Sequence, residues 1–195
     1  LETVRDALAK LQLASDDFLG SETKTLRVSV ATAFASNWLI HRLREFRELY
    51  PDIDLHFHSS NELANLRSGE ADVAIRWGGG DWPGVEKTRL LTDELFPVCS
   101  RRYLRETGGF AAPADLRNAL LMRHTLQPWK PWFAAAGVDM PEPVSRLQFS
   151  DSALMLQAAA DGAGVALARR ILVEHLLEEG RLLRLFEVSA HTDGA

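Results

Sequence analysis

The sequence lacks the features that mark several large classes of protein. Its one cysteine, Cys99, has no partner for an internal disulfide. No apolar run is long enough to cross a bilayer or to serve as a secretion leader. The 22 basic residues are outnumbered by 27 acidic ones, so the net charge is -5 and no basic block is present to grip phosphates. These absences predict a cytoplasmic protein with no membrane partner, whose residues here do not themselves bind DNA.

What is present suits an ordinary globular protein. A chain of 195 residues, 46% of them hydrophobic and 25% charged, can bury one large core or form two small lobes. The chain begins at Leu1 without an initiator methionine and closes on a polar stretch at 191–195. We therefore expect it to be cut from a longer protein.

Residues 1–19 have the spacing of a short amphipathic helix, which Gly20 ends. A narrow apolar seam of this kind more often pairs with a partner helix than with its own domain. The seam consists of Leu1, Val4, Leu8, Leu11 and Phe18.

From Leu26 onward, apolar residues alternate with polar ones, which is the period of a strand. A helix with one apolar stripe follows at Leu39, Leu43, Phe46 and Tyr50. Strands alternating with helices predict parallel pairing and an α/β lobe. The expected order is a strand at 26–30, a helix ending at Pro51, a strand at 53–57, a short helix that Asn61 caps and Gly69 ends, and a strand at 72–77.

The second half of the chain carries a similar alternation, and a second strand-helix-strand set is expected there. We predict an extended run at 90–100, short helices near 114–118 and 129–136, a brief strand at 146–149, a helix at 152–160 with Leu154, Met155 and Ala158 inward, a strand at 164–167, a helix at 171–177 ended by Gly180, and a last strand at 182–186.

Several segments together resemble the effector-binding domain of LysR-type transcriptional regulators, and most closely the branch of glycine-cleavage activators and β-lactamase regulators. Each segment alone is a weak signal, but their joint order and spacing span nearly the whole chain. They are the residues at 26–30, 34–35, 38–39, 46, 50–55, 71–78, 82–84, 95–100, 149–152 and 156–167.

The resemblance implies an α/β fold of two Rossmann-like subdomains of the type 2 periplasmic-binding-protein kind, joined by two crossing strands. Subdomain I would comprise 21–98 and 171–195, subdomain II would comprise 99–170, and 1–20 would be the end of a dimerising linker helix. The family also implies a small-molecule effector between the subdomains, a homodimer or homotetramer, and a winged helix-turn-helix that precedes this chain and binds DNA. The strand and helix that the family places after Phe186 are expected to be truncated or incomplete.

Two strand ends offer candidate effector contacts, because ligands in open α/β sheets bind beyond the carboxyl ends of strands, next to helix N-termini. One stretch runs from Thr32 to Ser36, and the other from Ser150 to Ser152. Ordinary helix capping is the competing explanation for any one of these side chains. Where this branch of the family often carries a hydroxyl before Phe34, this sequence has Ala33, so Thr32 or Ser36 can take its place.

Arg76 and Trp77 end a predicted strand and could offer a cation and a flat ring to the same ligand. A surface ion pair and a core tryptophan are the competing explanations. Asn61 follows another strand and can be a ligand contact or only a cap. The full set of expected effector contacts is Thr32, Ala33, Ser36, Asn61, Arg76, Trp77, Ser100, Asp151, Ser152 and Ala166.

Other motifs do not support catalysis or a resident cofactor. The glycines at 78–80 are not followed by the lysine and hydroxyl of a phosphate loop. His56 and His58 share one strand face, but the sequence supplies no third metal ligand. Cys99 lies in an apolar strand, where thiols are usually inert. We therefore predict that the chain is not an enzyme and holds no metal.

The function expected from the sequence is that of a ligand-sensing domain, in which an effector changes the geometry of an oligomer and thereby transcription. A free-standing two-lobed solute-binding protein is the alternative, since it needs the same fold. Absence of a leader argues against that alternative.

Overall fold

The computed structural model describes residues 25–78, 82–144 and 146–192. The chain forms two compact units, of which unit 1 takes the described residues up to Thr92 and unit 2 runs from Asp93 to Thr192. The predicted linker helix at 1–20 lies outside the described residues.

Unit 1 is built on a three-stranded parallel sheet. Strand β1 (Thr25–Val30) lies in the centre, with β2 (Asp54–Ser59) on one side and β3 (Val73–Ile75) on the other. Both neighbours run parallel to β1. The predicted parallel lobe is confirmed, and all three strands end at the same edge of the sheet.

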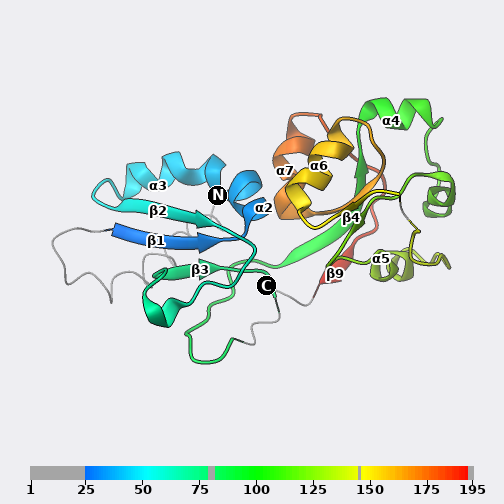
Figure 1. Cartoon of the computed structure of the whole chain (residues 1–195). Helices are drawn as coiled ribbons and strands as arrows, with labels where there is room; N and C mark the ends of the chain where they lie inside the picture. The colour runs from blue at the N-terminus through cyan, green and yellow to red at the C-terminus, as the bar shows by residue number, and fades with distance from the viewer. Residues whose placement is uncertain (1–24, 79–81, 145, 193–195) are drawn as a thin grey trace. The chain divides into compact units, whose positions relative to one another are not determined.

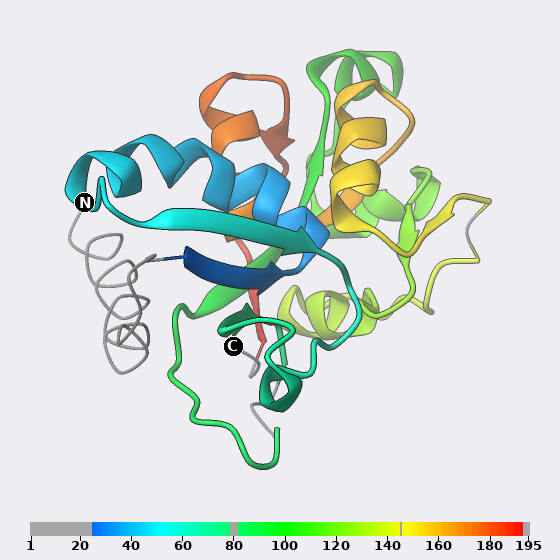
Figure 2. The ribbon, with the colours of Figure 1, turned by 60° about the vertical axis from the view of Figure 1, so that its left-hand side comes forward.

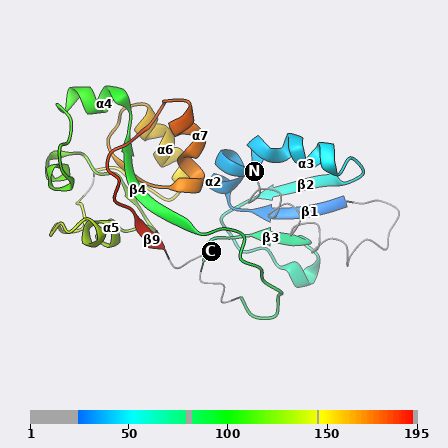
Figure 3. The same ribbon diagram turned by 180° about the vertical axis from the view of Figure 1, so that it is seen from behind.

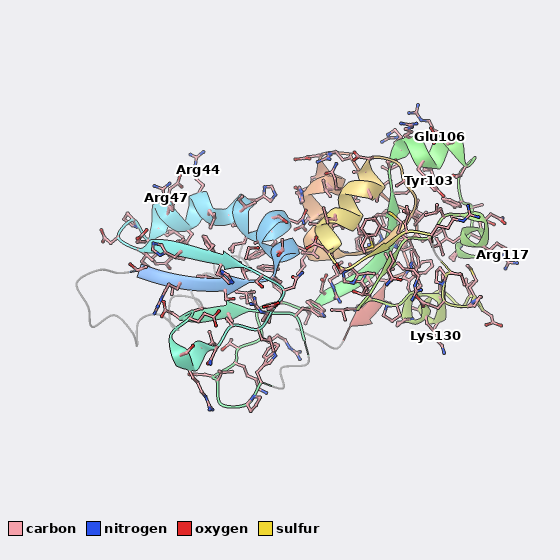
Figure 4. The ribbon with its side chains drawn as sticks, viewed as in Figure 1. Arg44, Arg47, Tyr103, Glu106, Arg117 and Lys130 are labelled. Atoms are coloured by element: carbon pink, nitrogen blue, oxygen red, sulfur yellow. The ribbon has the colours of Figure 1, made fainter. Side chains whose placement is uncertain are left out.

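One continuous helical stretch covers a face of this sheet (Figure 2). It consists of α2 (Thr32–Phe34), a π-helical turn η1 (Ala35–Leu39), a 3-10 turn η2 (Ile40–Arg42) and α3 (Leu43–Leu49). Leu39 and Phe46 of the predicted apolar stripe are buried, and Leu43 and Tyr50 are half-buried, which confirms the stripe. Trp38, which the stripe did not include, is also buried. On the opposite side Arg44 and Arg47 point away from the sheet (Figure 4).

The loop after β2 contains a single 3-10 turn, η3 (Leu66–Ser68). Its cap is Asn65, whose side-chain oxygen accepts hydrogen bonds from the N–H groups of Arg67 and Ser68 at 3.1 and 3.3 Å. The prediction that Asn61 caps this turn is wrong, because Asn61 precedes the first helical residue by too many positions for its side chain to reach the free N–H groups. Gly69 ends the turn in the left-handed region at φ 74°, as predicted.

Unit 2 has an antiparallel sheet around β4 (Asp93–Cys99). On one edge β4 pairs with β7 (Ala166–Arg169), and on the other it pairs with β8 (Leu183–Arg184) and β9 (Ala190–Thr192), always antiparallel. Figure 3 shows β9 beside β4. The sequence analysis placed the last strand at 182–186 and missed β9, whose three residues are too short and too polar to show a period.

The parallel part of unit 2 is smaller. Strands β5 (Arg123–His124) and β6 (Gln148–Phe149) pair in parallel, and Leu121 forms a parallel bridge with Val165 just before β7. Helix α6 (Ser152–Ala160) is therefore the crossover from β6 to β7, and the expected second strand-helix-strand set is confirmed.

The other helical segments of unit 2 are α4 (Arg101–Glu106), η4 (Pro113–Asn118), α5 (Lys130–Ala135) and α7 (Arg170–Glu178), shown in Figure 1. Helix α6 buries Met155, Leu156 and Ala159, whereas Leu154 is 64% exposed. The prediction that Leu154 points inward is wrong by one position, which corresponds to a rotation of about 100° around the helix.

Residues 171–192 pack within unit 2. Helix α7 contacts β4 and β7, and β8 and β9 are hydrogen-bonded to β4. These described residues therefore group by contact with the rest of unit 2, and the family-based assignment of 171–195 to subdomain I stays a prediction. Sequence periodicity does not reveal which sheet a late strand joins, because it is a local signal, whereas a strand pairs with a segment that is distant in the sequence.

The core of unit 2 is rich in aromatic side chains. Trp129 and Trp132 are fully buried, and each indole N–H has a backbone acceptor, at Met122 (2.8 Å) and Val188 (3.0 Å) respectively. Phe133 stacks on Trp129 with 5.6 Å between the ring centres. Cys99 is also fully buried, as predicted, and burial raises its pKa to about 11, so its thiol stays protonated.

Candidate functional site

In unit 1 the parallel sheet brings the predicted contacts to one edge. Thr32 follows β1, Asn61 follows β2, and Arg76 and Trp77 follow β3. Because the three strands are parallel, all of these residues lie beyond their carboxyl ends. Asn61 is exposed, whereas Thr32, Arg76 and Trp77 are half-buried.

Arg76 is the most firmly held of these side chains. Its guanidinium donates to the Ser29 hydroxyl at 2.6 Å, the Glu62 carbonyl at 2.7 Å and its neighbour's carbonyl, that of Ile75, at 2.9 Å. Its buried Nε has no hydrogen-bond partner among the described residues. Burial lowers the pKa of Arg76 from its ordinary value, yet the group remains a cation. Arg76 therefore ties the loop after β2 to the sheet and leaves positive charge at this edge.

The hydroxyl groups near α2 are not equivalent. Ser36 donates its hydroxyl back to the Thr32 carbonyl at 3.1 Å and accepts from the Asn37 amide at 3.1 Å. Ala31 precedes α2 and offers no side-chain cap, and Ala33 is half-buried. Thr32 is thus better placed than Ser36 to replace the hydroxyl that Ala33 lacks, because no described residue holds the Thr32 side chain.

In unit 2 the structure brings Asp151 and Ser152 together with a histidine that is absent from the expected effector contacts. His124 ends β5 next to the start of α6, and its Nε2 lies 3.4 Å from the Ser152 hydroxyl oxygen. Asp151 caps α6 by accepting from the N–H groups of Ala153 and Leu154 at 2.8 and 3.1 Å. The capping explanation therefore holds for Asp151, and Ser152 is left beside an imidazole.

The sequence analysis did not select His124 as a site residue, because Ser152 lies 28 positions away in the sequence and only the fold brings the two together. Burial and the positive charge of Arg169 lower the pKa of His124, against the opposite effects of the Asp151 charge and the Ser150 backbone. The ring Nδ1 accepts the N–H of Leu126 at 3.2 Å. The imidazole is therefore neutral and carries its proton on Nε2.

A second polar pair lies at the same edge of unit 2. Burial lowers the pKa of Arg169, at the end of β7, to about 10, although the charge of Asp93 acts to raise it. Burial raises the pKa of Asp93, whose Oδ1 accepts the N–H of Ile171 at 3.3 Å and so caps α7. Arg169 thus interacts electrostatically with Asp93 and with His124.

Two predicted contacts are placed elsewhere. Ser100 follows β4 and caps α4 by accepting from the N–H of Tyr103 at 3.2 Å. Ala166 begins β7, pairs with Val98 and is fully buried. Because β4 and β7 are antiparallel, Ser100 and Ala166 share one end of the sheet, and Arg169 lies at the other. The structure does not bring Ser100 and Ala166 together with Asp151 and Ser152.

Comparison with known proteins identifies the family. The family model described as the LysR substrate binding domain matches residues 19–192. The chain belongs to this LysR family. The resemblance stated from the sequence is confirmed.

Curated relatives of this LysR domain are transcriptional regulators. It is 35% identical over 159 residues to the glycine cleavage system transcriptional activator of Escherichia coli K12, covering 81% of this chain and 52% of that protein. It is 37% identical over 176 residues to the transcriptional activator AmpR of Providencia stuartii, covering 90% of this chain and 59% of that protein. The chain thus spans little more than half the length of these two relatives. Their names agree with the prediction that it is not an enzyme.

A solved structure supports the fold. The effector domain of AmpR from Pseudomonas aeruginosa superposes on this LysR domain with a TM-score of 0.77 at 33% identity, over 88% of this chain and 82% of that one. In the described part of the chain, no helix is long and apolar enough to cross a membrane. The same residues contain no cluster of three or more side chains suited to a metal ion.

The neutral state of His124 predicts a pH dependence of stability. Its pKa is lower in the folded LysR domain than the ordinary value of 6.5 that it regains on unfolding, so the unfolded chain binds more protons. This stabilising contribution is present above the unfolded pKa and is lost as the pH falls below it. We expect the free energy of unfolding to decrease from about pH 7.5 to about pH 5, measured by urea denaturation.

The variant His124→Gln isolates this contribution. Glutamine keeps polar atoms at the site but does not titrate, so its pH slope between these values should be flatter than that of the native chain. Asp93, with its raised pKa, has the opposite sign and is present in both chains, so it cancels in the difference. Equal slopes would contradict the assignment of a lowered pKa to His124.

Proposed function

We propose that this chain is the sensing part of a LysR-type transcription factor and that a small-molecule effector binds to it beyond the carboxyl ends of its parallel strands. The observation that supports this most strongly is the family match over 19–192 together with the likeness to an AmpR effector domain. In each unit, polar side chains gather beyond the carboxyl ends of parallel strands, which is where open α/β sheets bind ligands.

The proposed contacts differ in what they offer. Thr32 supplies a hydroxyl and Arg76 a positive charge from unit 1, with Trp77 and Asn61 beside them. Ser152 supplies a hydroxyl from unit 2. Effector binding would favour one conformation of the protein over another by the difference in its affinity for the two conformations, and this population shift would be the signal.

The signal would reach DNA through residues outside this chain. With a net charge of -5 and no block of basic residues in its sequence, the chain is not expected to bind the phosphate backbone itself. We propose that a winged helix-turn-helix in the longer protein makes that contact, and that a homodimer or homotetramer spaces two such domains. The exposed face of the helical stretch in unit 1, with Ile40 57% exposed, is the proposed subunit contact.

A metabolite screen by thermal unfolding tests the proposal. A true effector raises the melting temperature, since a ligand at one hundred times its Kd adds about 2.7 kcal/mol to stability. Thr32→Ala and Ser152→Ala should each remove most of the shift produced by the compound that the screen selects. Ser68→Ala, which alters a hydroxyl bonded only to the nearby Asn65 carbonyl, is the matched control and should keep the full shift.

Two results would count against the proposal. A shift unchanged in both Thr32→Ala and Ser152→Ala would reject this site. A selected compound that stabilises the longer protein without changing its affinity for its operator DNA would reject regulation and favour a solute-binding protein.

A further inference from the structure

We infer that the turn from His124 to Gln127 in unit 2 is a proton-sensitive switch, which is closed while the imidazole of His124 is neutral and opens when acid protonates that ring. The switch belongs to the fold itself and does not depend on which effector the chain binds. Acid is then expected to act on one particular turn, and not only on the stability of the whole unit.

The closed turn is held by two hydrogen bonds to His124. The N–H of Leu126 donates to the ring Nδ1 at 3.2 Å, and the N–H of Gln127 donates to the His124 carbonyl at 3.3 Å. A backbone N–H can only donate, so the first bond requires a lone pair on Nδ1. That bond therefore exists only in the neutral form of the ring.

Protonation changes this acceptor into a donor. The second proton of the imidazole goes to Nδ1, because Nε2 already carries the first and lies 3.4 Å from the Ser152 hydroxyl oxygen. Two N–H groups then face each other where the neutral ring had a hydrogen bond. Either the ring or the Leu126 backbone has to move away, and in both cases the turn loses the bond to Nδ1.

Gln127 connects the turn to the interior of unit 2. Its side chain is only 5% exposed, and its amide donates to the carbonyl of Leu167, in β7, at 2.6 Å. The turn therefore ties the end of β5 to β7 through a buried hydrogen bond. A turn that opens at Leu126 weakens the hold on Gln127, and the contact between β5 and β7 is expected to loosen with it.

The charges around the ring set the pH range of the switch. Burial and the charge of Arg169, on β7, lower the pKa of His124, whereas Asp151 at the start of α6 and the Ser150 backbone act to raise it. Asp93, on β4, acts on Arg169 in turn. Because the pKa of His124 lies below its ordinary value of 6.5, the turn should be closed at pH 7.5 and should open only below pH 6.5.

An NMR titration of the whole chain from pH 7.5 to pH 5 tests the switch. We expect the backbone amides of Leu126 and Gln127 and the side-chain amide of Gln127 to shift along one curve with a midpoint below pH 6.5. The ring nitrogens of His124 should follow the same curve and should show the Nε2–H tautomer at pH 7.5.

The variant His124→Asn separates the proton from the turn. The side-chain oxygen of asparagine can accept the N–H two residues further on, as in an Asx-turn, and it does not titrate. The turn should then stay closed down to pH 5, with no titration curve at Leu126 or Gln127. His58→Gln removes an exposed histidine of β2 and is the control, in which both residues should titrate as in the native chain.

Three results would overturn the inference. They are amides of Leu126 and Gln127 that do not follow the titration of His124, the same shifts in His124→Asn, and a ring that carries its proton on Nδ1 at pH 7.5. The proposed effector is tested separately, by ligand-induced stabilisation at pH 7.5, where the turn is closed. Failure of that screen would leave the switch intact, and failure of the switch would leave the proposed function intact.

Discussion

Replacing Trp129 with alanine is expected to lower the free energy of unfolding by about 3 to 5 kcal/mol, the range for an aromatic residue removed from a packed core. Trp129 is fully buried, stacks on Phe133 and meets Trp132 edge to face. Its N–H binds the Met122 carbonyl, which would lose its partner. A typical domain has a total stability of about 5 to 15 kcal/mol, so this loss would be a large fraction of it.

Urea denaturation followed by circular dichroism measures the effect, since fluorescence would change with the tryptophan itself. Val144→Ala, at a side chain that is 100% exposed, is the control and should change the free energy of unfolding by less than about 0.5 kcal/mol. The same small shift for Trp129→Ala would show that the aromatic cluster does not form the core of unit 2. Because Met122 leads into β5, the variant should also disturb His124.

Gly164→Ala is the second large effect, expected at about 1 to 3 kcal/mol for atoms forced into a packed interior. A β-carbon at Gly164 would lie 2.5 Å from the Leu120 carbonyl oxygen and 2.8 Å from a methyl group of Leu120. The same carbonyl accepts the N–H of Val165 at 2.9 Å. The clash can be relieved only by separating these two backbone segments, which also weakens the adjoining bond from the Met122 N–H to the Val165 carbonyl.

Amide exchange at Val165 and Met122 reports this separation directly. Gly108→Ala is the comparison, because Gly108 has φ 79° with open space around it, so the variant costs about 1 to 2 kcal/mol of backbone strain with no clash. Faster exchange at Val165 and Met122 is expected for Gly164→Ala alone. Equal exchange in the two variants would mean that the close approach at Leu120 is not required.

Trp129→Ala and Gly164→Ala both weaken contacts that hold the segment leading into β5. Because His124 ends β5, both changes in stability are expected to affect the candidate site. His124 ends β5, and its position against Ser152 depends on the strand being held by Val165 and by the Trp129 indole. Loss of effector response in either variant would therefore accompany loss of order in β5, whereas Ser152→Ala should lose the response with the fold intact.

The sequence by itself determined most of the elements and the family. Alternation from Leu26 predicted β1, the stripe ending at Tyr50 predicted the helical stretch of unit 1, and glycines marked the ends of η3 and α7. These features are local, because side-chain period and turn chemistry act over a few residues. The joint spacing of segments also sufficed for the LysR assignment, which the family match confirms.

Only the tertiary structure decided which residues meet. It gave the cap of η3 to Asn65 rather than Asn61, turned Leu154 outward, and placed α7, β8 and β9 beside β4. It also brought His124 to Ser152 across 28 positions of sequence and separated Ser100 and Ala166 from them. Strand pairing and burial depend on contacts between distant segments, and a local pattern carries no information about them. For that reason the family could be read from the sequence, and the partner that orients Ser152 could not.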